Sequence, residues 1–332
     1  MAKRGGTLAL VGSESLLGRE IRDLVSSSVP GADLRLIAAG EEEVGKVTRI
    51  DDEPVLVTLL SAASIEGARA VFLAGSPASS RRALELAGDA AIIDVTYAAE
   101  ERPDARLRAP LVESEPVEDG NVHVIAHPAA IALALFLRRL HAHDPIRRSV
   151  IHILAPASEQ GSAGIEELQQ QTISLLSFKS LPQAVFDTQL SFNLLARYGD
   201  EAPAGLEESE LRIERHLVSL LALAGEGEGA PVPSLRLIQA PVFHGFSFSA
   251  WVEFDGNPRV EALESGLGMD AIDVRGEELD PPTIVGQAGQ SGISVGAITP
   301  DRNNAEACWF WMVADNLRLA AENAVAVARQ LL

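Results

Sequence analysis

Residues 124–132, Val-Ile-Ala-His-Pro-Ala-Ala-Ile-Ala, come closest to a catalytic segment. The apolar start predicts a buried strand, Pro128 marks a turn, and the residues after it begin an apolar helix. The N-terminus of a helix lowers the pKa of a thiol, because the helix dipole stabilises the thiolate. Here the first turn carries Ala129 and Ala130 instead. A methyl group cannot act as a nucleophile.

A second segment, Gly12 to Gly18, has the spacing of a phosphate-binding loop. Glycines in such loops let backbone N–H groups approach a pyrophosphate closely. Ser15 replaces the middle glycine, and Glu14 places a carboxylate close to the expected pyrophosphate. We therefore expect no productive dinucleotide binding. The candidate cofactor-binding residues are Gly12, Ser15, Leu16, Leu17, Gly18 and Glu41, and the acidic run Glu41–Glu43 favours NAD over NADP because a carboxylate can accept from a free ribose hydroxyl.

Four further side chains could titrate or act as nucleophiles. Cys308 precedes Trp309-Phe310-Trp311, which favours an inert buried thiol. His244 precedes Gly245, so its direction is left open between a loop histidine and a recruited acid/base. His123 precedes the 124–132 segment and His127 lies within it. For each, a hydrogen bond to the backbone is the alternative to binding a polar ligand.

Composition limits the function classes. A length of 332 residues favours two domains, and a net charge of −20 opposes binding to nucleic acid or to an anionic membrane. The single cysteine excludes an internal disulfide and a multi-cysteine metal site, so we expect no metal. The longest apolar run, Ala129–Leu137, is too short to span a bilayer, and the N-terminus has no signal-like run, which predicts a cytoplasmic protein.

The elements that must position these residues follow an α/β pattern. Short apolar strands alternate with helices up to residue 126, which is typical of a parallel sheet covered on both faces. From residue 127 the pattern is more antiparallel, with Leu235–Val242 and Ser247–Phe254 as neighbouring strands. A long Ala-rich helix, Met312–Leu332, ends the chain. The strands predicted in addition are Thr7–Val11, Leu34–Ala39, Ala70–Ala74, Ala91–Asp94, Val122–Ala126, Arg148–Leu154 and Ser291–Ile298, and the helices are Leu16–Val25, Arg81–Ala87, Ser162–Leu176 and Glu210–Leu223.

An ordered set of segments resembles the aspartate-β-semialdehyde dehydrogenase family over nearly the whole chain. The segments are Gly12–Glu20, Ile92–Thr96, residues 124–132, Gly161–Thr172, Phe192–Leu194, Pro241–Ser247 and Met312–Val325. The resemblance implies a Rossmann-like dinucleotide-binding domain formed by residues 1–126 and 312–332. It also implies an α+β catalytic and dimerisation domain of residues 127–311, with the C-terminal helix returning to the first domain. Family enzymes reduce aspartyl phosphate with NADPH in amino-acid biosynthesis.

Four family site positions differ in this chain. The nucleophilic cysteine corresponds to Ala130, the substrate-positioning glutamine to Ala155, the carboxylate-binding arginine to Gln239 and the acid/base histidine to Phe246. We therefore expect a degenerate, Usg-like homologue without catalytic residues, a pseudoenzyme that persists as a homodimer binding a ligand, a partner or an active paralogue. The alternative is an active NAD(P)-dependent aspartate-semialdehyde dehydrogenase, or a related aldehyde oxidoreductase, with recruited residues.

Overall fold

The computed structural model describes residues 6–40, 43–50, 53–114, 120–224 and 229–332, and the chain divides into two compact units. The first unit contains Met1–Ala126 and Ala320–Leu332, and the second contains His127–Leu319. The expected return of residues 312–332 to the first unit starts too early, because Met312–Ala314 belong to a strand of the second unit.

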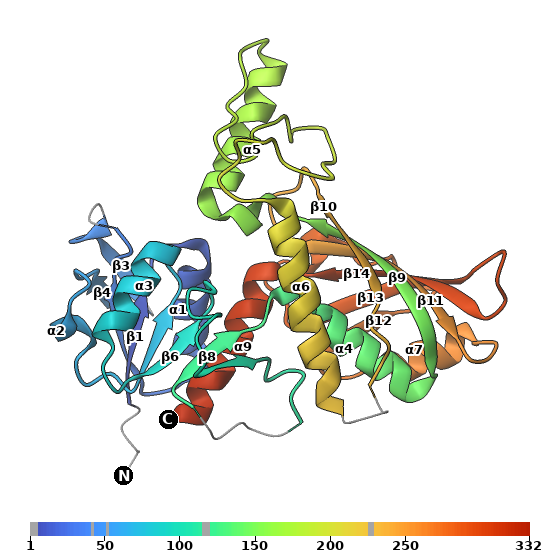
Figure 1. Ribbon diagram of the computed structural model, residues 1–332, viewed down its shortest axis with the longest axis horizontal. Helices are drawn as coiled ribbons and strands as arrows, with labels where there is room; N and C mark the ends of the chain where they lie inside the picture. Colours follow the sequence, from blue (N-terminus) through green and yellow to red (C-terminus); the bar gives the residue numbers. More distant parts are fainter. Residues whose placement is uncertain (1–5, 41–42, 51–52, 115–119, 225–228) are drawn as a thin grey trace. The chain divides into compact units, whose positions relative to one another are not determined.

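A six-stranded parallel sheet, sheet A, forms the centre of the first unit. Its strands run in the order β2-β1-β5-β6-β8-β7, with helices α1 and α3 packed beside β1 (Figure 1). The strand bounds are β1 Thr7–Val11, β2 Asp33–Ile37, β5 Ala70–Leu73, β6 Ala91–Asp94, β7 Ala105–Arg108 and β8 Val122–Ile125. The helices are α1 Leu16–Ser28, α2 Ala62–Ile65 and α3 Pro77–Leu86, and β3 Val47–Ile50 pairs with β4 Glu53–Leu56 in a separate hairpin.

The central strands of sheet A form where the sequence has short, uninterrupted apolar runs. All four residues of β5, β6 and β8 are buried, since both faces of a parallel sheet are covered. The predicted strands of this unit are confirmed, whereas β3, β4 and β7 were not predicted. These three strands are largely exposed and carry no apolar run, so hydrophobic patterning could not reveal them.

A second six-stranded sheet, sheet C, is mixed and forms the centre of the second unit. Its strand order is β10-β9-β11-β14-β13-β12. The prediction that Leu235–Val242 and Ser247–Phe254 are neighbours is wrong, because β9 lies between them. The strand bounds are β9 Ile146–Ala155, β10 Ser234–Gln239, β11 Phe246–Phe254, β12 Ile272–Arg275, β13 Ile293–Pro300 and β14 Ala307–Ala314.

Helices cover one face of sheet C and leave the other open. Helix α4 contacts α6, α7 and β9, and all but a few of its side chains are buried (Figure 1). The strands alternate accordingly; in β9, Ile151 and Ile153 are buried whereas Val150 and His152 are exposed. The helices are α4 Pro128–His143, α5 Gly161–Leu176, α6 Leu206–Leu221, α7 Val260–Leu267 and α8 Ile284–Gln287.

The last helix, α9, spans Asn316–Leu331 and continues into the first unit from residue 320. It starts later than predicted because the Asp315 carboxylate accepts hydrogen bonds from the N–H groups of Leu317 and Arg318, both at 3.0 Å. Within the first unit, Asn323 Oδ1 accepts from the backbone N–H of Leu111 at 3.1 Å. The C-terminal helix therefore completes the first unit, as the resemblance implies.

Candidate functional site

The structure brings the positions expected to carry chemistry to one edge of the second unit. Ala155 ends β9, Gln239 ends β10 beside it in register, and Phe246 begins β11. Ala130 lies in the first turn of α4, the turn that His127 caps. All four residues are at most 2% exposed. The four positions therefore lie at one edge of the second unit, and their side chains are part of its core.

Gln239 uses its whole side chain within this core. Its Nε2 donates to the carbonyl oxygens of Ala155 at 2.9 Å and Ala240 at 3.1 Å, and its Oε1 accepts from the Tyr198 hydroxyl at 2.6 Å. Burial raises the pKa of Tyr198, which keeps the hydroxyl protonated as the donor. Both N–H donors of the Gln239 amide are used, so none is left to bind a substrate carboxylate.

Phe246 fills the space beside these groups. Its ring is 0% exposed and lies 5.8 Å from the ring of His127, centroid to centroid. The hollow that Phe246 lines together with Ala155 and Glu159 encloses about 210 Å³ in all but leaves about 0 Å³ for a water molecule. A phenyl ring also has no titratable proton, so position 246 supplies no acid/base group, and the hollow beside it leaves no room for a substrate.

A polar network that the sequence did not reveal surrounds His127. Its Nε2 lies 2.9 Å from Glu159 Oε2, and its Nδ1 accepts from the Ala129 N–H at 3.2 Å. Because Nδ1 accepts, the proton of the neutral ring is on Nε2 and is donated to Glu159. Asn316 Nδ2 donates to the other Glu159 oxygen at 3.2 Å, and His216 Nδ1 accepts from the His127 N–H at 2.9 Å. His127 thus caps α4 and is satisfied on both ring nitrogens.

The residues considered as substitutes do not join this edge. His244 is exposed, and the left-handed turn at Gly245 (φ +84°) separates it from buried Phe246. Cys308 is 0% exposed in β14, and burial, followed by the charges of Asp144 and Asp301, raises its pKa to about 11. A buried thiol with this pKa is almost entirely protonated at neutral pH and is a poor nucleophile.

His123 belongs to a different cluster, in the first unit. Its Nδ1 lies 3.3 Å from the Arg108 guanidinium, which pairs with Glu113 at 2.8 Å and donates to Gln330 of α9 at 2.6 Å. His123 and Arg108 are each 1% exposed. Burial and the nearby Arg108 charge lower the pKa of His123 to about 4. This cluster joins α9 to the edge strands of sheet A and has a structural role.

A family model of the semialdehyde dehydrogenase dimerisation domain matches residues 137–319, more than half of the chain. The chain belongs to the semialdehyde dehydrogenase family. It is 26% identical to the aspartate-semialdehyde dehydrogenase of Rickettsia bellii over 98% of this chain and 97% of that one. It is 29% identical to the USG-1 protein homolog of Azotobacter vinelandii over the same shares of the two chains. A solved structure of a probable aspartate-semialdehyde dehydrogenase from Pseudomonas aeruginosa matches with a TM-score of 0.81 at 26% identity, over 98% of both chains.

The loop that the sequence analysis considered for dinucleotide binding lies in the first unit, between β1 and α1. Gly12 (φ +84°) lies so close to Gly75 that a Cβ at residue 12 would be 2.3 Å from the Gly75 backbone. Ser15 caps α1: its hydroxyl accepts from the Gly18 N–H at 2.9 Å and donates to the Ala74 carbonyl at 2.6 Å. The serine therefore occupies one of the N–H groups at the helix N-terminus that a phosphate would use.

Carboxylates near this loop are already paired. Glu14 lies 3.4 Å from Arg22 and 3.8 Å from Arg19, and Glu43 accepts from the Ala39 N–H at 2.8 Å. The nearest cations thus neutralise Glu14 and are not left for a pyrophosphate. These residues do not fit a tightly held dinucleotide. Glu41 and Glu42 lie outside the described residues, so the prediction for Glu41 stays a prediction.

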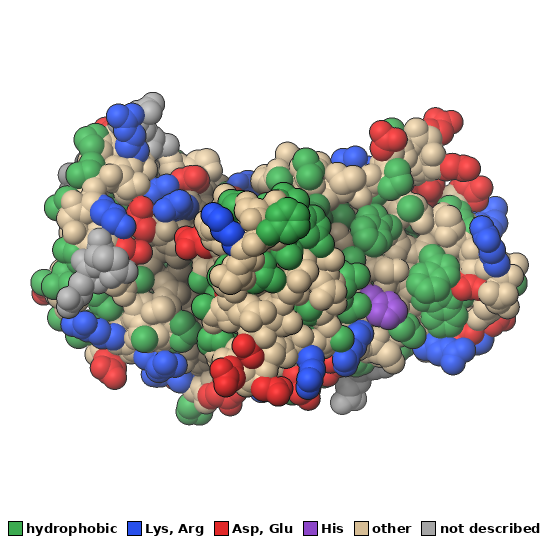
Figure 2. Space-filling model, turned by 90° about the horizontal axis from the view of Figure 1, so that it is seen from above, with side chains coloured by type: hydrophobic (Ala, Val, Ile, Leu, Met, Phe, Trp, Pro, Cys, Tyr) green, Lys and Arg blue, Asp and Glu red, His purple; other side chains and the backbone are tan. Residues whose placement is uncertain are grey.

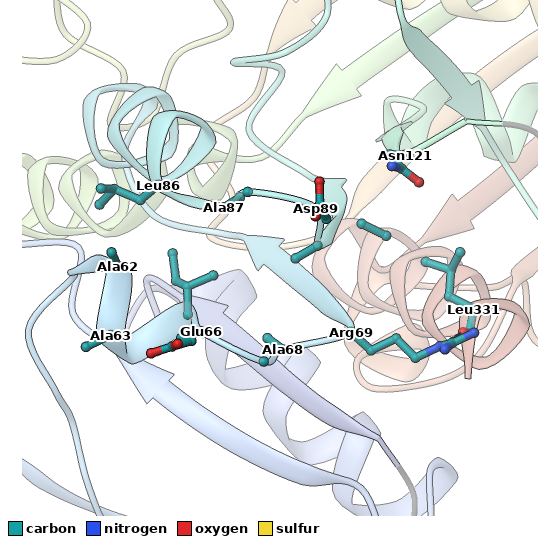
Figure 3. Close-up of a pocket in the computed structure, with 15 residues that line it drawn as sticks. Ala62, Ala63, Glu66, Ala68, Arg69, Leu86, Ala87, Asp89, Asn121 and Leu331 are labelled. Atoms are coloured by element: carbon teal, nitrogen blue, oxygen red, sulfur yellow. Dashed lines mark hydrogen bonds between the residues drawn. The ribbon is translucent and has the colours of Figure 1, made fainter.

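Two hollows lie at opposite ends of the strands of sheet A. One, of about 240 Å³, follows the carboxyl ends of β2 and β5 and is lined by small residues with Arg82 at its rim. The other, of about 780 Å³, lies at the amino ends of β5 and β6 (Figure 3). Alanines dominate its lining, and the Arg69 guanidinium is turned to the Leu331 carbonyl. The polar residues of its lining are Glu66, Arg69, Asp89 and Asn121.

Among the described residues, no group of three or more His, Cys, Asp or Glu side chains is arranged to hold a metal ion. None of the helices in the same residues is long and apolar enough to cross a membrane.

Proposed function

We propose that this protein is a semialdehyde dehydrogenase homologue that has lost catalysis and persists as a homodimer that binds a ligand or a partner. The observation that supports the loss is the edge formed by Ala130, Ala155, Gln239 and Phe246, where each residue is buried and none can act as nucleophile, acid/base or carboxylate anchor. The matched family enzymes are called aspartate-semialdehyde dehydrogenases, which is why this substrate is the one to test.

The decisive assay measures oxidation of aspartate semialdehyde with phosphate and NAD or NADP by the purified protein. We expect no turnover above the uncatalysed rate. A rate constant in the ordinary enzyme range, on the order of 1–10³ s⁻¹, would overturn the proposal. The single variant Ala130→Cys should also be inactive, because Gln239 and Phe246 still deny the substrate its anchor and its acid/base group.

A thiol control separates this proposal from an active enzyme with a recruited nucleophile. Cys308 is the only cysteine, so an activity that alkylation abolishes would identify it as the nucleophile. The buried position of Cys308 and its raised pKa predict slow alkylation in the folded protein instead. Alkylation after unfolding in urea serves as the matched positive control for reagent quality.

We further propose that NAD binds no better than weakly, and in preference to NADP. Two features of the chain support this proposal. Within the loop, Glu14 pairs with Arg22 and Ser15 occupies the N–H group of Gly18. After β2, acidic residues follow, among them Glu43. Thermal-shift titration with NAD, NADP and aspartate-family metabolites tests this, since specific binding raises the apparent stability. A micromolar Kd for NADP would contradict it.

The homodimer is proposed to form through the open face of sheet C. This face carries the three tryptophans of the chain, and Trp251 and Trp309 are cross-strand neighbours whose Nε1 atoms both donate to Asp301 Oδ2 at 2.9 Å. Trp309 is 40% exposed and Val150, opposite Trp251 on β9, is 41% exposed. Light scattering should give a mass of about twice the 35.2 kDa of one chain. Recovery of a heteromeric complex with an active paralogue from source cells would point to a regulatory partner instead.

A further inference from the structure

The hollow of about 780 Å³ at the amino ends of β5 and β6 lies within the first unit (Figure 3). Six of the residues that line it are alanines and two are glycines, so methyl groups and backbone form most of its wall. The loop considered for dinucleotide binding follows β1, at the opposite, carboxyl ends of these parallel strands. A ligand in the hollow would therefore occupy a site separate from that of a dinucleotide.

The polar side chains of this lining are available to a ligand. In Figure 3, Arg69, Asp89 and Asn121 lie around one part of the hollow, and Glu66 lies apart from them at the end of α2. Within the described parts of the chain, the side chains of Glu66, Asp89 and Asn121 have no hydrogen-bond or ion-pair partner. Arg69 uses its Nε for the Leu331 carbonyl, which leaves both of its NH₂ groups for a ligand.

The charges of the hollow favour a ligand with more positive groups than negative ones. Its lining holds two carboxylates, Glu66 and Asp89, and one guanidinium, Arg69. Helices α3 and α9 both end at the hollow, at Leu86 and Leu331, and the C-terminus of a helix favours a cation. The net charge of −20 also raises the concentration of cations at the surface of the chain. A ligand with two ammonium groups and one carboxylate therefore matches this lining.

A basic α-amino acid of the lysine type carries these three groups in one molecule. Its carboxylate can accept two parallel hydrogen bonds from the NH₂ groups of Arg69. Its α-ammonium can donate to the Asp89 carboxylate and to the Asn121 amide oxygen, which lie in the same part of the hollow. The methylenes of its side chain then run along the alanines, and the terminal ammonium pairs with Glu66. Apolar walls with a few placed polar groups are typical of a small-molecule site.

We propose that this hollow binds a basic α-amino acid, a molecule with two ammonium groups and one carboxylate on a short methylene chain. Binding there depends on neither the loss of catalysis nor the homodimer proposed above, because all the lining residues belong to the first unit. A chain that fails to bind such a ligand would leave both of those proposals standing.

Isothermal titration calorimetry of the full chain with L-lysine measures the affinity, and we expect a Kd below about 1 mM. Three probes each lack one of the three charged groups: cadaverine has no carboxylate, 6-aminohexanoate has no α-ammonium, and L-norleucine has no side-chain ammonium. Each probe should bind at least about 10-fold more weakly than L-lysine, because one charged group of the hollow loses its partner. Cadaverine that binds as tightly as L-lysine would overturn the assignment of an amino acid.

Two substitutions test the carboxylates one at a time. Glu66 and Asp89 are exposed, so Glu66→Gln and Asp89→Asn each remove a charge with little effect on folding. Each variant should raise the Kd for L-lysine at least about 10-fold. Glu66→Gln should leave the Kd for L-norleucine unchanged, because that probe has no side-chain ammonium, whereas Asp89→Asn should raise it. This difference distinguishes two defined contacts from a general loss of acidity.

Acidic side chains are spread over the face of the molecule shown in Figure 2, so general attraction of cations to an acidic chain is the competing explanation. The matched control Glu277→Gln/Glu278→Gln removes two exposed carboxylates outside the hollow and should leave the Kd for L-lysine unchanged. Three outcomes refute the site: no binding of L-lysine to the wild type up to about 10 mM, an equal loss in the control and in the Glu66 and Asp89 variants, or no loss in those variants. Loss confined to the Glu66 and Asp89 variants supports it.

Discussion

Replacement of Phe246 by the family's histidine tests whether the former site is now core. The variant Phe246→His restores the expected acid/base type at the position where the resemblance places it. Phe246 is 0% exposed and contacts the rings of His127 and Phe248, each at 5.8 Å between centroids. If this edge is packed core, histidine should destabilise the second unit and add no activity.

The magnitude follows from what the imidazole would meet. Loss of a fully buried phenyl ring removes about 2–3 kcal/mol of burial free energy. An imidazole also brings two nitrogens, and each one left without a partner costs about 1–3 kcal/mol. His127 cannot serve as partner, because its Nε2 is engaged by Glu159 and its Nδ1 by the Ala129 N–H. With one nitrogen unpaired, we expect a total loss of about 3–6 kcal/mol, or about 6–24 °C in Tm for a unit of this size.

Urea unfolding followed by tryptophan fluorescence is the appropriate assay, because Trp251, Trp309 and Trp311 all lie in sheet C and report on this unit. Phe246→Leu is the control; it keeps an apolar side chain and should cost roughly 1–2 kcal/mol. Wild-type stability in the histidine variant, or aldehyde turnover gained by it, would refute the view that this edge is core.

The parts of the fold with strong hydrophobic patterning could be predicted from the sequence. Runs such as Ala70–Leu73 and Ala91–Asp94 are recognisable because every residue is buried. The start of α9 was misplaced although a signal was present: Asp315 precedes the helix and caps it. The order of β10, β9 and β11 could not be predicted, because strand neighbours far apart in sequence are chosen by packing and leave no local pattern.

The candidate site shows the same division. Ala130, Ala155, Gln239 and Phe246 were found through a family resemblance and lie together. The hydrogen-bond partners of the polar groups at this edge were not predicted from the sequence. Tyr198 reaches Gln239 from the segment between α5 and α6. Glu159 and His216 contact His127 from separate elements, and Asn316 of α9 donates to Glu159. Hydrogen-bond partners across such sequence distances depend on the tertiary structure and have no spacing of their own.

Three further outcomes are expected. The pKa of His123 is about 4 in the folded protein and 6.5 in the unfolded one, so the free energy of unfolding should fall as the pH decreases between these values, by about 2 kcal/mol at pH 5. Urea unfolding at pH 7.5 and 5.0 should show this loss in the wild type and not in His123→Gln. Equal losses in both proteins would contradict the prediction. Glu113→Gln should cost about 3–5 kcal/mol because Arg108 stays buried without its carboxylate, whereas Arg108→Met/Glu113→Gln should cost less; the reverse order in urea unfolding would oppose this. Tyr198→Phe should cost about 1–2 kcal/mol by leaving Gln239 Oε1 without its donor, and a loss of zero would show that this bond contributes nothing.

The residues at this edge contribute to the stability of the fold and leave no strained or unpaired group for a reaction. Active sites commonly hold polar groups without partners and backbone strain, which cost stability and enable reaction. Here Gln239 and His127 have partners for their polar atoms, and Phe246 is packed between two rings. The non-glycine residues of the second unit with a left-handed backbone lie elsewhere, at Phe178, Asp187, Phe192 and Ala297. The proposed function therefore assigns binding to the open face of sheet C and not to this edge, whose polar groups are satisfied within the chain.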